Sequence, residues 1–190
     1  GLRDWPNMVR YSQQAEELGA DGLMIIPPYY YTPTEDEIFN YYKAICEACG
    51  LPIMLYNNPF TSNVDMPAKL VGKLTKSFEQ IRYIKEASQR IERVHDIIVE
   101  SDGLMNVWAG QRVLESYKMG AKGYVNPYGN YIPRASVKFV EWAEQGRWVE
   151  ARELAHALPI LPIAVRNWVV WQVQPSGSGP NLSSYSPAWY

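Results

Sequence analysis

Hydrophobic positions along the chain alternate between two spacings, one typical of amphipathic helices and one typical of short buried strands. Residues 6–18 carry apolar side chains every three to four positions, and Gly19 follows them as a helix stop signal. The continuous apolar run at 22–27 comes directly afterwards and predicts a strand. The chain therefore opens with a helix followed by a strand.

The same alternation continues to residue 126. Thr34 and Glu37 have the spacing of a capping box, which predicts a helix from Thr34 to Gly50, and residues 51–56 predict the next strand. Further helices are expected near 67–74, 91–99 and 112–119, and further strands at 81–86, 104–109 and 122–126. Five strands separated by helices favour right-handed βαβ crossovers and a parallel sheet, so the predicted fold class is α/β.

Two parallel-sheet architectures fit this order, an open doubly wound sheet and a closed barrel. An open sheet usually carries a Gly-rich phosphate loop, and the sequence contains neither G-x-G-x-x-G nor a Walker A motif. Polar and aromatic residues gather instead where strands end: Tyr29, Tyr30, Tyr56, Asn57, Lys85, Glu86, Gly110 and Asn126. This favours a (β/α)8 TIM barrel. Since such a barrel has eight units, we expect a truncated one, with about five βα units present and the first three missing.

The C-terminal stretch has a different composition. Residues 1–162 are predicted to form the partial barrel domain. Residues 163–190 hold a single charge, Arg166, and three of the seven tryptophans, and 175–180 has linker composition. No helical or strand period holds there, so we expect 163–190 to be an atypical, irregular or disordered tail.

Charge and hydropathy exclude several classes of partner. A formal net charge of -2 supplies no basic field for nucleic acid or anionic lipid. No apolar run approaches the roughly 20 residues that span a bilayer, and no signal peptide is recognisable. We therefore expect a cytoplasmic protein. Cys46 and Cys49 form a C-x-x-C, but zinc needs about four ligands and no second Cys or His pair lies nearby, so packing under a strand is the preferred interpretation.

Lys85 is the residue that indicates chemistry most directly. Alternation along 81–86 places Lys85 on the same face as Ile81 and Tyr83, which in a barrel strand can be the interior. An ammonium there is costly unless it is paired or loses its proton, and the neutral amine is the nucleophile that a carbonyl substrate requires. The alternative is a lysine at the strand mouth that pairs with Glu86 or extends to water.

Tyr56 ends the preceding strand. Neighbouring parallel strands lie about 4.8 Å apart, so its hydroxyl is expected to reach substrate atoms held by Lys85 and to transfer protons. The alternative is a tyrosine packed at the barrel mouth with its hydroxyl in water.

These motifs together resemble the family of dihydrodipicolinate synthase and N-acetylneuraminate lyase, which are class I aldolase-type barrels acting on pyruvate and related 2-keto acids. The resemblance covers roughly residues 5–158. The matching stretches are Gly19 to Gly22, Pro27 to Tyr30, Leu55 to Pro59 and Ile84 to Ser88, with weaker agreement at Ala109-Gly110 and Gly120 to Gly123.

The resemblance implies Lys85 as the imine-forming lysine and Tyr56 as the proton-relay tyrosine. It also implies a homo-oligomer, dimer or tetramer, in which Tyr30 reaches a neighbouring subunit's site; an ordinary interface tyrosine is the alternative. In relatives, Gly110 and the backbone around Val125 line the pocket, although Gly110 also fits a plain turn. Neither a metal nor an organic cofactor is required.

Substrate choice rests on a departure from the family. The synthase branch has an arginine shortly after the Tyr-Asn-x-Pro motif, whereas residues 60–63 read Phe-Thr-Ser-Asn. Neutral groups there, with the amides of Asn57 and Asn58, suit a hydroxyl-rich substrate, although they also fit a simple turn and N-cap. We therefore expect a lyase acting on pyruvate or a 2-keto-3-deoxy sugar acid, with Asn57 binding substrate. The alternatives are 4-hydroxy-tetrahydrodipicolinate synthase proper and a truncated, non-catalytic barrel fragment. The keto-acid carboxylate loop of the family precedes this chain.

Overall fold

The structure is a computed structural model that describes residues 5–125 and 128–157. The predicted tail at 163–190, the end of the predicted first domain at 162, and Asn126 lie outside the described residues.

The described strands form one parallel sheet in the order β1-β2-β3-β4-β5. Their bounds are β1 Leu23–Ile25, β2 Ile53–Asn57, β3 Ile81–Glu86, β4 Asn106–Ala109 and β5 Gly123–Tyr124. The α/β class and the parallel sheet are thereby confirmed. A doubly wound sheet reverses its strand order at a switch point, whereas this sheet adds each strand beside the previous one, as a barrel does.

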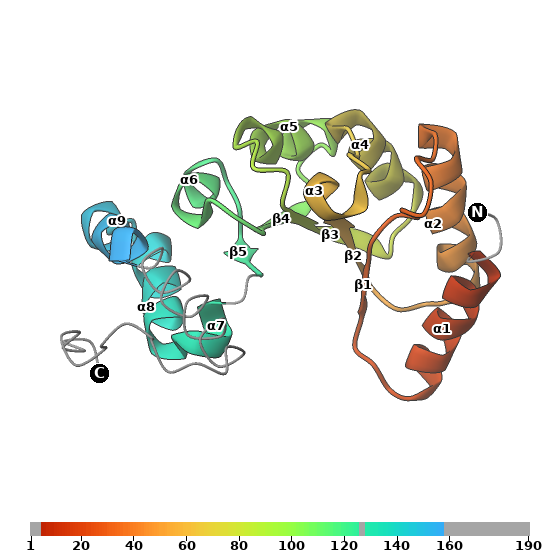
Figure 1. Cartoon of the computed structure of the whole chain (residues 1–190), viewed down its shortest axis with the longest axis horizontal. Coiled ribbons are helices and arrows are strands. Elements are labelled where there is room, and N and C mark those ends of the chain that lie inside the picture. Colours follow the sequence, from red (N-terminus) through yellow and green to blue (C-terminus); the bar gives the residue numbers. More distant parts are fainter. Residues whose placement is uncertain (1–4, 126–127, 158–190) are drawn as a thin grey trace, which may run out of the picture.

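Helices alternate with these strands, and α4 and α5 lie on the outer side of the sheet (Figure 1). The helices are α1 Trp5–Glu17, α2 Glu35–Ala48, α3 Pro59–Ser62, α4 Ala68–Ser77, α5 Glu92–Glu100, α6 Val113–Lys118, α7 Tyr128–Tyr131, α8 Pro133–Glu144 and α9 Trp148–Ala157. The predicted capping box is confirmed, since Thr34 Oγ1 accepts from the Glu37 N–H and Glu37 Oε2 accepts from the Thr34 N–H. Helices α3, α7, α8 and α9 were not predicted.

Two apolar cores hold these elements together. The larger lies between the outer face of the sheet and α2, α4 and α5, and includes Ile25, Ile38, Ile45, Ile53, Leu55, Leu74, Ile84, Ile97 and Val107. Gly72 permits the close approach of α4 to α5, because a Cβ there would collide with the carbonyl of Glu100. The smaller core centres on Phe139, Ala143 and Ala151 of α8 and α9.

Strand β3 contains an irregularity at Arg82. Ile53 pairs with Ile81, but Met54 pairs with Tyr83, so Arg82 is an extra residue on β3. The Arg82 guanidinium fixes this point, since Nη1 donates to the carbonyls of Phe78 and Ile81 at 2.8 and 2.9 Å, and to that of Thr75. Ile81 is consequently buried in the outer core. Its predicted place on the face of Lys85 was wrong, because the extra residue reverses the alternation; Tyr83 was placed correctly.

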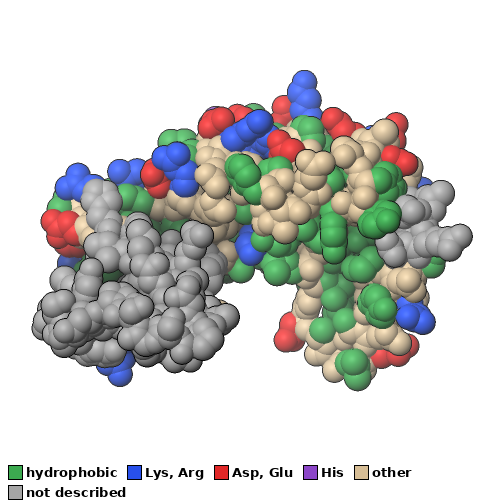
Figure 2. Space-filling view, viewed as in Figure 1, with side chains coloured by type: hydrophobic (Ala, Val, Ile, Leu, Met, Phe, Trp, Pro, Cys, Tyr) green, Lys and Arg blue, Asp and Glu red, His purple; other side chains and the backbone are tan. Residues whose placement is uncertain are grey.

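The opposite, inner face of the sheet is less covered. The register brings Met24, Met54 and Tyr83 into one row and Tyr56, Lys85, Trp108 and Gly123 into the next. Met24 is 52% exposed and Tyr83 38% exposed. Figure 1 shows the described elements arranged as an arch, and Figure 2 shows hydrophobic side chains on its lower side between the middle and the right limb. No helix within the two described ranges combines the length and apolarity that crossing a bilayer requires.

Candidate active site

Tyr56 and Lys85 lie side by side on the inner face of the sheet. They are register partners on β2 and β3, both are half-buried, and Lys85 Nζ lies 4.1 Å from the centroid of the Tyr56 ring. Lys85 forms no ion pair within the described part of the chain. The alternative pairing with Glu86 does not occur, because the two side chains leave β3 on opposite faces.

The Tyr56 hydroxyl has a protein partner that the sequence did not indicate. Asn58 Nδ2 donates to Tyr56 Oη at 2.8 Å and to Thr61 Oγ1 at 3.1 Å. Asn58 is the first residue after β2 and the N-cap of α3, so the chain turns there and directs the amide back to the strand end. A polar side chain at this turn is a weak sequence signal, since turns attract asparagine for local reasons alone.

Asn57 lies on the other face of β2 and is completely buried. Its Nδ2 donates to Glu86 Oε2 at 2.9 Å and to Asp65 Oδ1 at 3.0 Å, while its Oδ1 accepts from the Met66 N–H at 3.0 Å. The amide nitrogen and the amide oxygen are therefore both used within the protein. The expected substrate contact of Asn57 stays a prediction; in the structure its side chain faces away from Lys85 and Tyr56 and joins the strand ends from behind.

Arg93 on α5 completes this buried network. It donates to both carboxylate oxygens of Asp65 at 2.9 Å and to the Met66 carbonyl, while Arg90 Nη1 lies 3.7 Å from Asp65 Oδ2. Partial burial would raise the pKa of Asp65, but the hydrogen bonds from Arg93 and Asn57 and the two arginine charges outweigh it and hold that pKa below its usual value.

Glu86 is the most deeply buried carboxylate of the network. Burial raises its pKa above the usual value, and this effect outweighs hydrogen bonds from Ser88 and Asn57 and the charge of Arg93. The Ser88 N–H donates to Glu86 Oε1 at 2.6 Å. The network thus binds the segment after β2 to the segment after β3 directly behind the Tyr56–Lys85 pair.

Gly110 and Val125 lie at the ends of the next strands. The Gly110 N–H donates to the Glu86 carbonyl at 2.7 Å and the Val125 N–H to the Ala109 carbonyl at 2.9 Å. A Cβ on Gly110 would lie 2.6 Å from Ala87 Cβ, so this position accepts only glycine without movement. Gly110 is therefore more than a turn residue, while pocket lining by Gly110 and Val125 remains a prediction.

Trp108 stands beside Lys85 on the inner face and was not identified from the sequence. The two residues are register partners, and the indole lies over Gly123, where a Cβ would come within 2.6 Å of the ring. Trp108 Nε1 is buried and has no hydrogen-bond partner among the described residues. Trp108 thus lies on the strand that flanks Lys85 on the side opposite Tyr56, and its ring covers Gly123.

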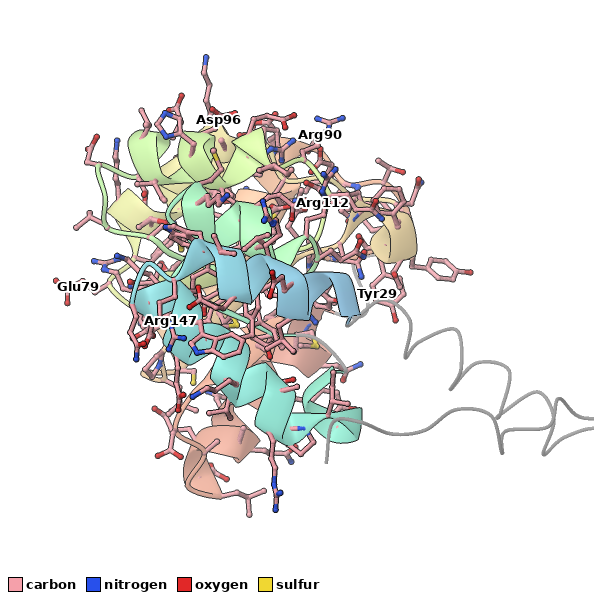
Figure 3. All side chains as sticks on the ribbon, turned by 90° about the vertical axis from the view of Figure 1, so that its left-hand side faces the viewer. Tyr29, Glu79, Arg90, Asp96, Arg112 and Arg147 are labelled. Atoms are coloured by element: carbon pink, nitrogen blue, oxygen red, sulfur yellow. The ribbon has the colours of Figure 1, made fainter. Side chains whose placement is uncertain are left out.

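Tyr29 and Tyr30 follow β1 and are exposed, Tyr30 by 87%. Figure 3 shows Tyr29 on the same side as Arg90 and Arg112, which follow β3 and β4, while Glu79, which precedes β3, lies at the opposite side. The carboxyl ends of the strands therefore share one end of the molecule. The role of Tyr30 in a neighbouring subunit's site remains a prediction.

A cavity of about 560 Å³ lies at the other end of the strands and does not include Lys85 or Tyr56. Its lining includes Cys46, Phe78 and Arg82. Cys46 and Cys49 are free and buried, and burial raises the pKa of the Cys46 thiol to about 12. A thiol in that state is a poor nucleophile, which agrees with the expected packing role.

A parallel β/α protein with polar and ionisable side chains gathered at the carboxyl ends of adjacent strands is typical of barrel enzymes. The chain belongs to the Dihydrodipicolinate synthetase family, whose family model matches residues 6–175. That family match, together with its structural neighbours, assigns the TIM-barrel α/β fold.

Curated relatives support the same assignment. The chain is 30% identical over 160 residues to a 4-hydroxy-tetrahydrodipicolinate synthase of Methanococcus aeolicus, covering 83% of this chain and 55% of the relative. It is 34% identical over 140 residues to one of Phocaeicola vulgatus, covering 73% and 47%. The chain thus spans about half the length of the curated relatives it matches.

Solved structures agree with the sequence relatives. The 4-hydroxy-tetrahydrodipicolinate synthase of Methylacidiphilum fumariolicum SolV superposes with a TM-score of 0.79 at 27% identity, covering 91% of this chain and 56% of that chain. A prophage protein of the family from E. coli K12, in complex with pyruvate, superposes with a TM-score of 0.80 at 25% identity, covering 97% and 66%.

Proposed function

We propose that the protein is a lyase that forms a Schiff base between Lys85 and pyruvate or a 2-keto-3-deoxy sugar acid. The observation that carries the proposal is the Tyr56–Lys85 pair, with an amine 4.1 Å from the ring of a tyrosine on the adjacent strand. Family membership supports it, and the prophage relative from E. coli K12 was crystallised with pyruvate.

Tyr56 is the proton donor in this mechanism. The neutral Lys85 amine adds to the ketone carbon as the carbonyl π bond breaks, and Tyr56 gives its proton to the oxygen. The resulting phenolate takes a proton back from the ammonium nitrogen. A second proton from Tyr56 lets the hydroxyl leave as water, and a protonated imine and a phenolate remain. The iminium then accepts electrons when a bond beside the former carbonyl breaks.

Synthesis of 4-hydroxy-tetrahydrodipicolinate is the second candidate function. The names of the curated relatives favour it. Both candidates begin with the same Lys85 imine and differ in what reacts with it. We propose an oligomeric assembly in which Tyr30 approaches a neighbouring site; its exposure is consistent with that role.

The imine is tested by incubating the chain with pyruvate and sodium borohydride and locating the added mass by peptide mass spectrometry. We expect the label on Lys85 and none in Lys85→Arg, which keeps the charge but cannot form the imine. Lys43→Arg, a change at an exposed lysine on α2, should label like the parent. Labelling that persists in Lys85→Arg would disprove the assignment.

A further inference from the structure

The hydrogen bond between Asn58 and Tyr56 determines which way the phenol proton points. Asn58 Nδ2 lies 2.8 Å from Tyr56 Oη and an amide nitrogen only donates, so the phenol oxygen accepts and its own proton remains available for another acceptor. We propose that Asn58 is a positioning residue that keeps Tyr56 oriented as a proton donor toward the carbonyl held by Lys85. The inference rests on the proposed imine chemistry.

Hydrogen bonds hold both the backbone and the side chain of Asn58 in place. Its backbone carbonyl accepts from the N–H groups of Thr61 and Ser62 at 3.1 and 3.0 Å and from Ser62 Oγ at 2.9 Å. Its second amide hydrogen goes to Thr61 Oγ1 at 3.1 Å. The short helix α3 therefore fixes both the position and the rotation of the amide that meets Tyr56.

The contact strengthens as the reaction proceeds. When Tyr56 gives its proton to the substrate oxygen, the phenol becomes a phenolate, and a hydrogen bond to a charged oxygen is roughly twice as strong as one to a neutral oxygen. The Asn58 N–H thus stabilises the state in which the proton has moved more than the state before it. Such a difference lowers a barrier, whereas equal binding of both states does not.

Asn58 differs in this respect from its neighbour in the sequence. Asn57 and Asn58 carry the same amide group. The amide of Asn57, however, is hydrogen-bonded to Asp65, Glu86 and Met66 on the outer side of the sheet. Asn58 contacts the phenol from the inner side. Only substitution at position 58 is expected to act on proton transfer rather than on the joining of strand ends.

The test replaces the donor by an acceptor of the same shape. Asn58→Asp presents a carboxylate that accepts a hydrogen bond from the Tyr56 hydroxyl, so we expect trapping of pyruvate on Lys85 by borohydride to slow by about 10²-fold near neutral pH. The matched control is Asn40→Asp, which adds the same charge at an exposed position of α2 that does not contact Tyr56. It should react at the parent's rate.

The pH profile distinguishes positioning from a structural effect. The carboxyl group that Asn58→Asp introduces donates again once it is protonated, so the deficit of this variant should shrink as pH falls toward about 4, the usual range of an aspartate. Asn58→Ala removes the contact without reversing it and should slow trapping about tenfold at every pH, the effect of one typical hydrogen bond. Thr61→Ala, which frees one amide hydrogen, should give a smaller slowing than Asn58→Ala.

The outcomes identify which proposal fails. If the parent chain traps no pyruvate on Lys85, the proposed function and this inference fail together. If the parent is trapped and Asn58→Asp matches Asn40→Asp at all pH values, the positioning role alone is wrong. Thermal unfolding of each variant is recorded; should Asn58→Asp not fold, trapping of Asn58→Ala at the parent's rate would equally overturn the inference.

Discussion

The Asn57 amide donates a hydrogen bond of 2.9 Å to the Glu86 carboxylate, one register position beyond the Tyr56–Lys85 pair and on the opposite face of the sheet. Each side chain of the reactive pair is therefore followed in sequence by a buried partner that joins the same two strands from behind. Any change in this buried contact acts on the spacing of the two strand ends.

The first prediction concerns the pH dependence of stability. Burial raises the pKa of Glu86 above its usual 4.5, so just above pH 4.5 the folded state retains a proton that the unfolded state has lost. The free energy of unfolding therefore falls as pH rises through that interval. Asp65 acts oppositely, since its lowered pKa gives stability that is lost as pH falls below 3.8.

Glu86→Gln should remove the decline above pH 4.5, because glutamine does not titrate. The variant also replaces one acceptor oxygen by an NH2 group, so either the Asn57 amide or the Ser88 N–H loses its acceptor, and we expect the variant to be less stable than the parent just above pH 4.5 by about 1–3 kcal/mol. Urea unfolding measured between about pH 4 and about pH 7 checks both points. Glu79→Gln, on the exposed turn before β3, is the control; an identical slope in the Glu86→Gln variant would contradict the prediction.

The second prediction concerns Gly110. A methyl group there meets Ala87 Cβ at 2.6 Å and the Glu86 carbonyl at 3.0 Å, so Gly110→Ala must move the end of β3. We expect a loss of about 1–3 kcal/mol in stability and trapping on Lys85 slowed by about tenfold. Gly129→Ala, where a Cβ meets nothing within 4 Å, is the matched control. Unchanged trapping in Gly110→Ala would contradict the prediction, because it would show that the end of β3 can move without affecting the reaction at Lys85.

The third prediction concerns association. The inner face exposes Met24 and Tyr83, and β1 is an edge strand of the described sheet; apolar faces and unpaired strand edges associate with other chains. We expect the 190-residue chain to be marginally stable, weakly active and prone to self-association, and Met24→Glu to reduce its apparent mass in light scattering. Leu18→Glu adds the same charge at a side chain 88% exposed just after α1 and should have no such effect. A fully active monomer at high concentration would refute this expectation.

The fourth prediction concerns substrate. We expect a higher kcat/KM for a 2-keto-3-deoxy pentonate or hexonate than for pyruvate with aspartate semialdehyde. The structure leaves fewer neutral side chains free to bind a substrate than the sequence suggested. Ser62 is buried and donates to the Asn58 and Val64 carbonyls, which agrees with the alternative of a simple turn. Thr61 is exposed but already accepts from Asn58. A clear preference for the semialdehyde would favour the synthase function that the relatives' names indicate.

Hydrophobic periodicity was sufficient to predict the alternating helices and strands up to β5. Each of these elements buries one apolar face, and the helix caps depend on residues that are close in sequence. Alternation along β2 also predicts that Asn57 and Tyr56 lie on opposite faces, as the structure shows. Two features of the site could not be predicted from local sequence patterns. The contact of Asn58 with Tyr56 depends on how the chain turns after β2, and the position of the Trp108 ring depends on Gly123 from the next strand.

The extra residue in β3 changes the parity of the strand. Ile81 and Lys85 are separated by an even number of positions, which in a regular strand would place them on one face, yet Ile81 lies in the outer core and Lys85 on the inner face. A regular strand of the same length would either expose Ile81 on the inner face or turn the amine outward into the core. The side on which the amine emerges is therefore determined by one irregular pairing as well as by the identity of the residues.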